Sequence, residues 1–426
     1  MIPRIKPIFN NEILQVLNSV NSDEINSAAE NFKSELKKNY GFNEIIFFES
    51  GRSALSCCLK QIKTEKKFEV IISAFTCSVV ADAVINSGCR PVFADCDLSD
   101  FSLDVDSMIN CVSDKTLAII YPHHFGIASK GVLKAADYVK EKKIFLIEDI
   151  AQSLFCSVNA KYAGSFGDLA VMSFGLDKPI SCGQGGALLI NNKNSLINCY
   201  NKPEPETKET QDILSLILTD YLFNPENYKN FSQLESAERF IKKNNINTFD
   251  NINETLLKFE NHISKKKEYK TNKLKNIICS VLNLNAKIKE FIISEKKIFV
   301  LKKNFEKFKD ASLIRNSNAV NWRNFIVSKY SDKIIPFEIS ENDSTHNILK
   351  YPAVAKEKKI AEEVCSTFKK NFNIEIGNFN WPYILPERKA YKKYSNKSAK
   401  CKNAFSICGK VLNFPVHIDL PQFIGV

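Results

Sequence analysis

Short apolar runs alternate with helical patterns through the first half of the chain. Runs rich in Ile, Val, Leu and Phe are typical of strands that are buried on both faces of a sheet. They lie at residues 45–48, 70–73, 91–95, 117–121, 144–149, 168–174 and 186–190. Helical patterns lie between several of them, at residues 53–62, 78–86 and 130–143. This alternation is typical of parallel βαβ units, so the pattern predicts an α/β fold with a mostly parallel sheet.

The pattern changes after about residue 200. Residues 203–311 are polar and rich in Lys and Asn, and their longest amphipathic stretch is 287–308, which would cross toward a second domain. Residues 320–426 return to short strand-like runs, including WRNFIVS and KVLNFPV. The changes divide the chain into three expected parts, residues 1–230, 231–311 and 312–426.

Composition narrows the class of protein. The chain has 426 residues, of which 44% are hydrophobic and 25% charged, as expected for a globular protein with a substantial core. Its net charge is +11, and lysine runs such as residues 265–267 are best interpreted as solvated helical faces. An anionic substrate or an anionic membrane surface is the alternative. No basic block is interleaved with aromatics, so we expect no nucleic-acid partner.

Cysteine and histidine usage argues against a metal site. The 13 cysteines include no CxxC pair and only five histidines are present, so no metal ligand set is expected. The N-terminus shows no signal-peptide pattern, and no apolar run approaches the roughly 18 residues of a membrane span. We therefore expect reduced thiols in a cytoplasmic protein.

One lysine stands between an apolar strand and a glycine-rich turn. The stretch SFGLDKPISCGQGG contains Lys178, and Asp149 ends another apolar strand 29 positions earlier. Such a lysine can be an ion-pair partner, a phosphate ligand or a Schiff-base nucleophile. A lysine and an acid at the carboxyl edge of a parallel sheet suit pyridoxal phosphate, whose aldehyde meets the amine and whose ring nitrogen meets the acid. Asp149 alone would equally serve as a helix N-cap.

A phosphate cradle is also predicted. ESGRSAL, at residues 49–55, reads as a strand end, a glycine turn and a helix start. Backbone N–H groups and the positive end of a helix favour an anion there. The side chains of Arg52 and Ser53 would add to it, Gly51 would permit close approach, and Ser173 would offer a further hydroxyl.

Taken in order, these motifs resemble a known family. SGRSAL, AFTCSVVADAVINSGCRPVFADCD, PHHFG, IEDIAQS, GSFGDLAVMSF and GQGGAL resemble the DegT/DnrJ/StrS aminotransferases, which are pyridoxal-phosphate-dependent sugar aminotransferases of fold type I. The resemblance runs from about Ile2 to Ile190 and resumes faintly with LKYPAVAK and LNFPVHIDLP. It implies a large cofactor-binding domain over residues 1–230, with a mainly parallel seven-stranded sheet flanked by helices. A smaller α+β domain would follow over residues 312–426.

The resemblance also implies roles for individual residues. Lys178 matches the Schiff-base lysine, Asp149 the acid at the pyridine nitrogen, and Gln152 the side chain near the ring hydroxyl. The implied phosphate ligands are Gly51, Arg52, Ser53 and Ser173. Cys77 stands where the family has a ring-stacking aromatic, so either its sulfur packs on the ring or Phe75 does, although simple core packing is favoured for Phe75.

Two further family features are less clear. The glycine-x-asparagine segment that a partner subunit lends to the phosphate has only a weak candidate at residues 283–288. His123 matches a family histidine, and a hydrogen-bonded core histidine is the favoured interpretation. The resemblance nevertheless implies a homodimer with sites at the interface.

The implied activity is transamination. Glutamate would donate its amino group, and a nucleotide-linked keto-deoxysugar would accept it, for polysaccharide, lipopolysaccharide or glycoside biosynthesis. Lys178 would move the proton and would have to be neutral, so we expect the site to lower its pKa. One alternative is a pyridoxal-phosphate-dependent sugar dehydratase, in which histidine replaces the lysine. Another is a non-catalytic or regulatory protein on this scaffold, and a nicotinamide dehydrogenase would need a GxGxxG that is lacking.

Overall fold

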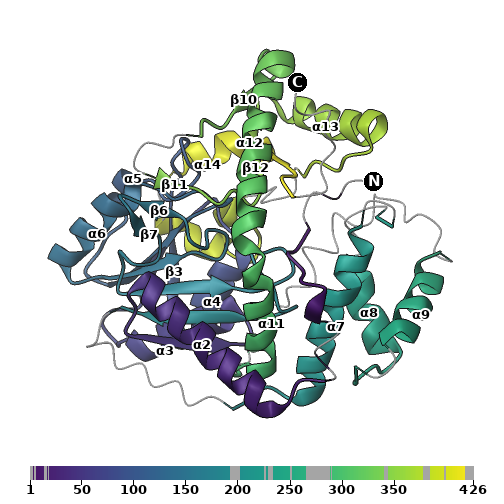
Figure 1. The fold of residues 1–426 in the computed structure, drawn as a ribbon. Coiled ribbons are helices and arrows are strands. Elements are labelled where there is room, and N and C mark those ends of the chain that lie inside the picture. Colours follow the sequence, from purple (N-terminus) through teal and green to yellow (C-terminus); the bar gives the residue numbers. More distant parts are fainter. Residues whose placement is uncertain are drawn as a thin grey trace.

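The computed structural model describes most of the chain (Figure 1). The described residues are 3, 6–13, 17, 19–191, 202–224, 227–228, 234–249, 252–264, 288, 290–339, 344–377, 384–397 and 400–417. The lysine run at residues 265–267 lies outside them, as does the candidate partner segment 283–288 apart from Ile288.

A seven-stranded sheet forms the centre of the molecule. Its strands are β1 (Glu44–Phe48), β2 (Glu69–Ser73), β3 (Arg90–Ala94), β4 (Thr116–Pro122), β5 (Phe145–Asp149), β8 (Leu169–Ser173) and β9 (Gly186–Ile190). Their spatial order is β1-β9-β8-β5-β4-β2-β3. The strands from β3 to β8 pair in parallel, whereas β9 pairs antiparallel with both β8 and β1. The predicted strands and the mainly parallel sheet are thus confirmed.

Both faces of this sheet are buried, as the continuous apolar runs predict. In β8, Leu169 and Val171 pack into one apolar cluster, whereas Ala170 and Met172 pack into another on the opposite face. This alternation follows from the two-residue period of a strand. Covering helices are α2 (Ser22–Tyr40), α3 (Gly51–Ile62), α4 (Ser78–Asn86), α5 (Val105–Asn110) and α6 (Gly131–Lys142). The helices predicted within residues 1–150 are therefore present.

The polar middle of the chain is helical. It contains α7 (Glu206–Leu222), α8 (Leu234–Lys243), α9 (Ile252–Ser264), α11 (Glu295–Glu306) and α12 (Phe308–Tyr330). Figure 1 shows α7, α8 and α9 to one side of the sheet, with α11 and α12 crossing the molecule. The predicted amphipathic stretch 287–308 thus becomes helical only from Glu295, and the expected domain boundary at residue 312 falls inside α12.

One strand prediction in the second half is wrong. WRNFIVS lies within α12, where Ala319, Trp322 and Ile326 are buried. These positions follow the three- and four-residue spacing of a helix face, so helix packing accounts for an apolar run that is too short to identify its own period. KVLNFPV does contain a strand, β13 (Val411–Phe414).

Short elements complete the C-terminal part. β13 forms a three-stranded sheet with β10 (Ile334–Pro336) and β12 (Tyr351–Ala355), and β11 (Ser344–Thr345) forms another with β6 (Ser157–Val158) and β7 (Lys161–Tyr162). The helical elements are α13 (Lys358–Thr367), η2 (Phe368–Phe372), η3 (Leu385–Glu387), η4 (Lys392–Lys397) and α14 (Lys402–Ile407). Across the described ranges, no helix has both the length and the apolar character to cross a membrane.

Candidate active site

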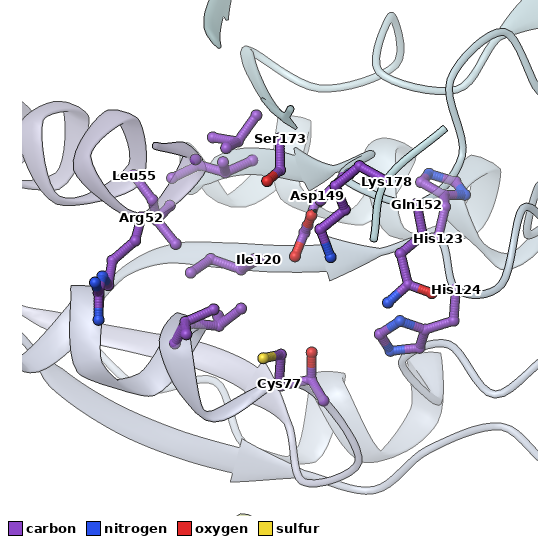
Figure 2. Close-up of a pocket in the computed structure, with 17 residues that line it drawn as sticks. Arg52, Leu55, Cys77, Ile120, His123, His124, Asp149, Gln152, Ser173 and Lys178 are labelled. Carbon is purple, nitrogen blue, oxygen red and sulfur yellow. Dashed lines mark hydrogen bonds between the residues drawn. The ribbon is translucent and has the colours of Figure 1, made fainter. Parts of the chain in front are cut away.

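A cavity lies at the carboxyl ends of the central parallel strands, next to the first turns of α3 and α4 (Figure 2). Parallel strands commonly place ligands at this edge. Seven of the eight predicted site residues line it, namely Gly51, Arg52, Cys77, Asp149, Gln152, Ser173 and Lys178. Figure 2 shows Lys178 beside Asp149, Cys77 on the opposite wall, and the guanidinium of Arg52 at the end away from Lys178.

Two glycines let the first turn of α3 lie directly on the sheet. A Cβ at Gly186 would stand 2.1 Å from the backbone nitrogen of Gly51. A Cβ at Gly51 would stand 2.9 Å from the carbonyl oxygen of Met172. Neither position has room for a side chain. The close approach brings the N–H groups of the first turn of α3 next to Ser173 at the end of β8, where an anion would be favoured.

Ser53 is the predicted residue that does not line the cavity. Its Oγ lies 2.8 Å from Oγ of Ser50 and 3.3 Å from Oε1 of Glu49. Ser50 is the N-cap of α3, and its Oγ accepts the N–H of Ser53 at 3.1 Å. The hydroxyl of Ser53 therefore belongs to the helix cap in this structure.

Asp149 brings a half-buried carboxyl group into the cavity. Its Oδ1 accepts the N–H of Ala151 at 3.0 Å, which orients the carboxyl group. No helix begins after Asp149, so the N-cap alternative does not apply. Burial raises the pKa of Asp149, and the Ala151 hydrogen bond and the charge of Lys178 offset only part of that effect. A cation next to this carboxyl, such as a protonated ring nitrogen, would favour its ionised form.

Lys178 is charged rather than neutral in the ligand-free protein. Burial alone would lower the pKa of its amine, but the neighbouring acidic groups, Asp177 above all, outweigh burial, and the pKa is raised. Asp177 is the closest of these partners, with Oδ1 at 3.3 Å from Nζ. The expectation that the site lowers the pKa of Lys178 is therefore wrong for this state, because several acidic groups surround the amine.

Two adjacent histidines line the cavity, and both are held by hydrogen bonds. Nε2 of His123 lies 3.1 Å from Oε2 of Glu148, while Nδ1 accepts the N–H of Ser129 at 3.1 Å. His123 thus has both ring nitrogens engaged, as predicted for a core histidine. His124 was not predicted as a site residue. Its Nε2 lies 3.2 Å from the carbonyl oxygen of Phe75, and burial lowers its pKa to about 3, so the ring is neutral.

Nothing in the sequence distinguishes His124 from an ordinary loop residue, because PHHF has no period that points one histidine toward the cavity.

The structure does separate Cys77 from Phe75. Cys77 precedes α4 and lines the cavity. Phe75 is fully buried and packs against Phe101, with ring centroids 6.4 Å apart. Burial raises the pKa of the Cys77 thiol, so a neutral, polarizable group occupies this wall.

The donor set of the cavity fits pyridoxal phosphate. An amine and a carboxyl group, on Lys178 and Asp149, stand at one part of the cavity. The hydroxyl of Ser173 and the N-terminus of α3 also line the cavity, as do apolar side chains such as Val171 and Ile147. The amine suits the aldehyde of the cofactor and the carboxyl group suits its ring nitrogen. The hydroxyl and the helix N-terminus suit its phosphate, and the apolar side chains suit its flat ring.

The described residues have fold type I of the pyridoxal-phosphate-dependent enzymes, the fold of solved aminotransferase structures. Aminotransferase PseC of Helicobacter pylori, involved in the biosynthesis of pseudoaminic acid, superimposes with a TM-score of 0.68 at 15% identity, covering 100% of this chain and 96% of that one. Residues 3–201 match the DegT/DnrJ/EryC1/StrS aminotransferase family. The match covers slightly less than half of the chain.

Curated relatives match over somewhat less than half of the chain. The chain is 29% identical over 191 residues to dTDP-4-dehydro-2,3,6-trideoxy-D-glucose 4-aminotransferase of Saccharopolyspora spinosa, covering 44% of this chain and 49% of that protein. It is 26% identical over 203 residues to GDP-perosamine synthase of Vibrio cholerae, covering 47% and 55%. The matches thus span about half the length of these relatives.

Proposed function

We propose that the protein is a pyridoxal-phosphate-dependent aminotransferase that moves an amino group from glutamate to a nucleotide-linked keto-deoxysugar. The observation that carries the proposal is the meeting of Lys178 and Asp149 in one cavity, beside a phosphate cradle built from α3 and Ser173. The match of residues 3–201 to the DegT/DnrJ/EryC1/StrS aminotransferase family supports the reaction class. The names of the two curated relatives support a nucleotide-linked sugar as the acceptor.

The residues divide the work by position. When bound, the cofactor supplies an aldehyde that carries the amino group and a ring that accepts electrons. Nζ of Lys178 would hold the cofactor and, once released, would carry the proton to and from the substrate carbon. The carboxylate of Asp149 would keep the proton on the ring nitrogen.

The remaining predicted ligands would hold the cofactor in place. The hydroxyl of Ser173, the N–H groups at Gly51 and Arg52 and the guanidinium of Arg52 would bind the phosphate. Gln152 would donate to the ring hydroxyl oxygen, and Cys77 would contact the ring face. Ser53 is not proposed as a side-chain ligand of the phosphate. Its proposed part is to shape the first turn of α3.

The proposal includes a cytoplasmic homodimer that acts in polysaccharide, lipopolysaccharide or glycoside biosynthesis. Thiols are compatible with a reducing compartment, since no disulfide joins cysteines in the described part of the chain. A sugar dehydratase is disfavoured by Lys178, because the resembling dehydratases carry histidine there. The other alternative is a non-catalytic protein on this scaffold, and the following experiment distinguishes it from the aminotransferase.

The test uses the full-length protein with added pyridoxal phosphate. Borohydride reduction followed by mass spectrometry should show a covalent adduct on Lys178, and the visible-edge absorption of the bound cofactor should disappear when glutamate is added. Lys178→Ala should give no adduct and should lower turnover by about a thousandfold or more. A control at a lysine that does not line the cavity, Lys161→Ala, should retain the adduct. A wild-type protein that binds no cofactor would sink the proposal in favour of the scaffold interpretation.

A further inference from the structure

A carboxylate that the proposed mechanism does not use stands next to Lys178. Oδ1 of Asp177 lies 3.3 Å from Nζ of Lys178, and Oδ2 lies 3.4 Å from it. The side chain of Asp177 is 42% exposed, whereas that of Lys178 is 18% exposed. The pair therefore lies where the cavity meets solvent, with the carboxylate on the outer side.

The other ionisable groups around the amine come from three different elements. They are Asp149 at the end of β5, Cys77 before α4, and His124 after β4. Burial raises the pKa of both Asp149 and Cys77, which disfavours their charged forms, and His124 is neutral. Asp177 differs because its partial exposure leaves water in contact with the carboxylate, and water favours the ionised form.

We propose that Asp177 is a positioning residue that holds the amine of Lys178 at the cavity as an ammonium and so sets the pH at which Lys178 becomes nucleophilic. The significance of this role rests on the proposed function, since only the neutral amine attacks an aldehyde. Asp177 would hold the amine before the cofactor arrives and recapture it when substrate releases Lys178. This is a different task from that of Asp149, which faces the ring nitrogen.

The ion pair is measurable without any cofactor. Cofactor-free protein is labelled with trace acetic anhydride from pH 7 to about pH 11.5, which includes the titration of the amine, and acetylation of Lys178 is followed by mass spectrometry. Asp177→Asn keeps the size of the side chain but removes its charge. An adjacent opposite charge raises an amine pKa by one unit or more, and the exposed position favours the low end of that range. The variant should therefore titrate about one pH unit lower and label about tenfold faster at pH 8.

The control is an aspartate–lysine pair far from the cavity. Oδ1 of Asp106 lies 2.7 Å from Nζ of Lys134, and both side chains are largely exposed. Asp106→Asn should therefore leave the labelling of Lys178 unchanged. Asp177→Ser provides a second variant without the charge, and circular dichroism confirms that each variant is folded. An unchanged labelling rate would overturn the proposal. A faster rate with an unshifted midpoint of the labelling–pH curve would also overturn it, because it would report improved access instead of altered charge.

The outcome is independent of the proposed function. A shift in the titration of Lys178 in a protein that binds no pyridoxal phosphate would support the role of Asp177 and reject the aminotransferase. Normal cofactor binding with an unshifted titration would reject the role of Asp177 alone. If both hold, the pH dependence of cofactor loading should also move to lower pH in Asp177→Asn.

Discussion

The backbone N–H of Phe125 donates to Oε1 of Gln152 at 3.0 Å. This hydrogen bond assigns the two ends of the amide, because the oxygen is the acceptor and Nε2 is then the end available to donate toward the cavity. Both Gln152 and the loop that carries Phe125 follow parallel strands, β5 and β4, at the same edge of the sheet. A contact between these two strand ends thus orients a predicted cofactor ligand.

Gln152→Glu isolates the donor. The carboxylate keeps an oxygen for the N–H of Phe125 but replaces the donating Nε2 by an acceptor. We expect pyridoxal phosphate to bind about 10- to 100-fold more weakly, which corresponds to the loss of one hydrogen bond to a charged group. Equilibrium titration of the cofactor absorbance measures the effect. Unchanged affinity would mean that Gln152 does not contact the ring hydroxyl.

Asp149→Asn should separate stability from cofactor binding. Because burial raises the pKa of Asp149, the unfolded chain loses this proton at lower pH than the folded protein. The free energy of unfolding of the wild type therefore falls as pH rises through that interval. Asparagine does not titrate, so the variant escapes this loss. The stability of the cofactor-free variant, measured relative to the wild type, should therefore be greater at pH 8 than at pH 4. Its affinity for the cofactor should fall by about 10- to 100-fold.

Thermal unfolding of both cofactor-free proteins at pH 4 and pH 8 measures this dependence. Asp106→Asn, which changes an exposed carboxylate, is the control and should follow the wild type. The interpretation of Asp149 fails if its asparagine variant shows the same pH dependence as the wild type and binds the cofactor equally well.

Ser173→Ala should weaken the hold on the phosphate alone. Ser173 ends β8 and lines the cavity next to the first turn of α3. Losing a hydrogen bond to a charged phosphate should raise the dissociation constant for pyridoxal phosphate about 10- to 100-fold. Pyridoxal, which has no phosphate, should bind both proteins equally. The control is Ser87→Ala, which removes a buried hydroxyl bonded to the carbonyl oxygen of Val84, outside the cavity, and should change stability but not affinity.

Lys297→Met should destabilise the fold. Nζ of this fully buried lysine lies 2.8 Å from Oε2 of Glu204 and 2.6 Å from Oδ2 of Asp212, which joins α11 to α7. Lys208 remains 2.8 Å from Asp212, but the fully buried carboxylate of Glu204 is left with only that lysine, 3.5 Å away, at a cost of about 3 kcal/mol. Lys134→Met breaks an exposed pair instead and should cost less than about 1 kcal/mol. Urea unfolding compares the two variants, and equal midpoints would contradict the role of the buried pair.

The sequence alone determined the sheet and the positions of the two key side chains. Continuous apolar runs mark β5 and β8, and these strands place Asp149 and Lys178 near one edge because parallel strands share it. Strand and helix periods are local properties, so they are visible along the chain. The short run around Trp322 is the exception, because only packing inside α12 revealed its helical period.

Only the tertiary structure decided how these side chains are oriented and charged. The hydroxyl of Ser53 is engaged with Ser50 and Glu49, and His124 reaches the cavity from a loop with no period. The charge of Lys178 depends on Asp177 above all, and also on acidic groups brought from other elements, such as Asp149. Hydrogen-bond partners and desolvation arise from segments far apart in the chain, so no local pattern contains them.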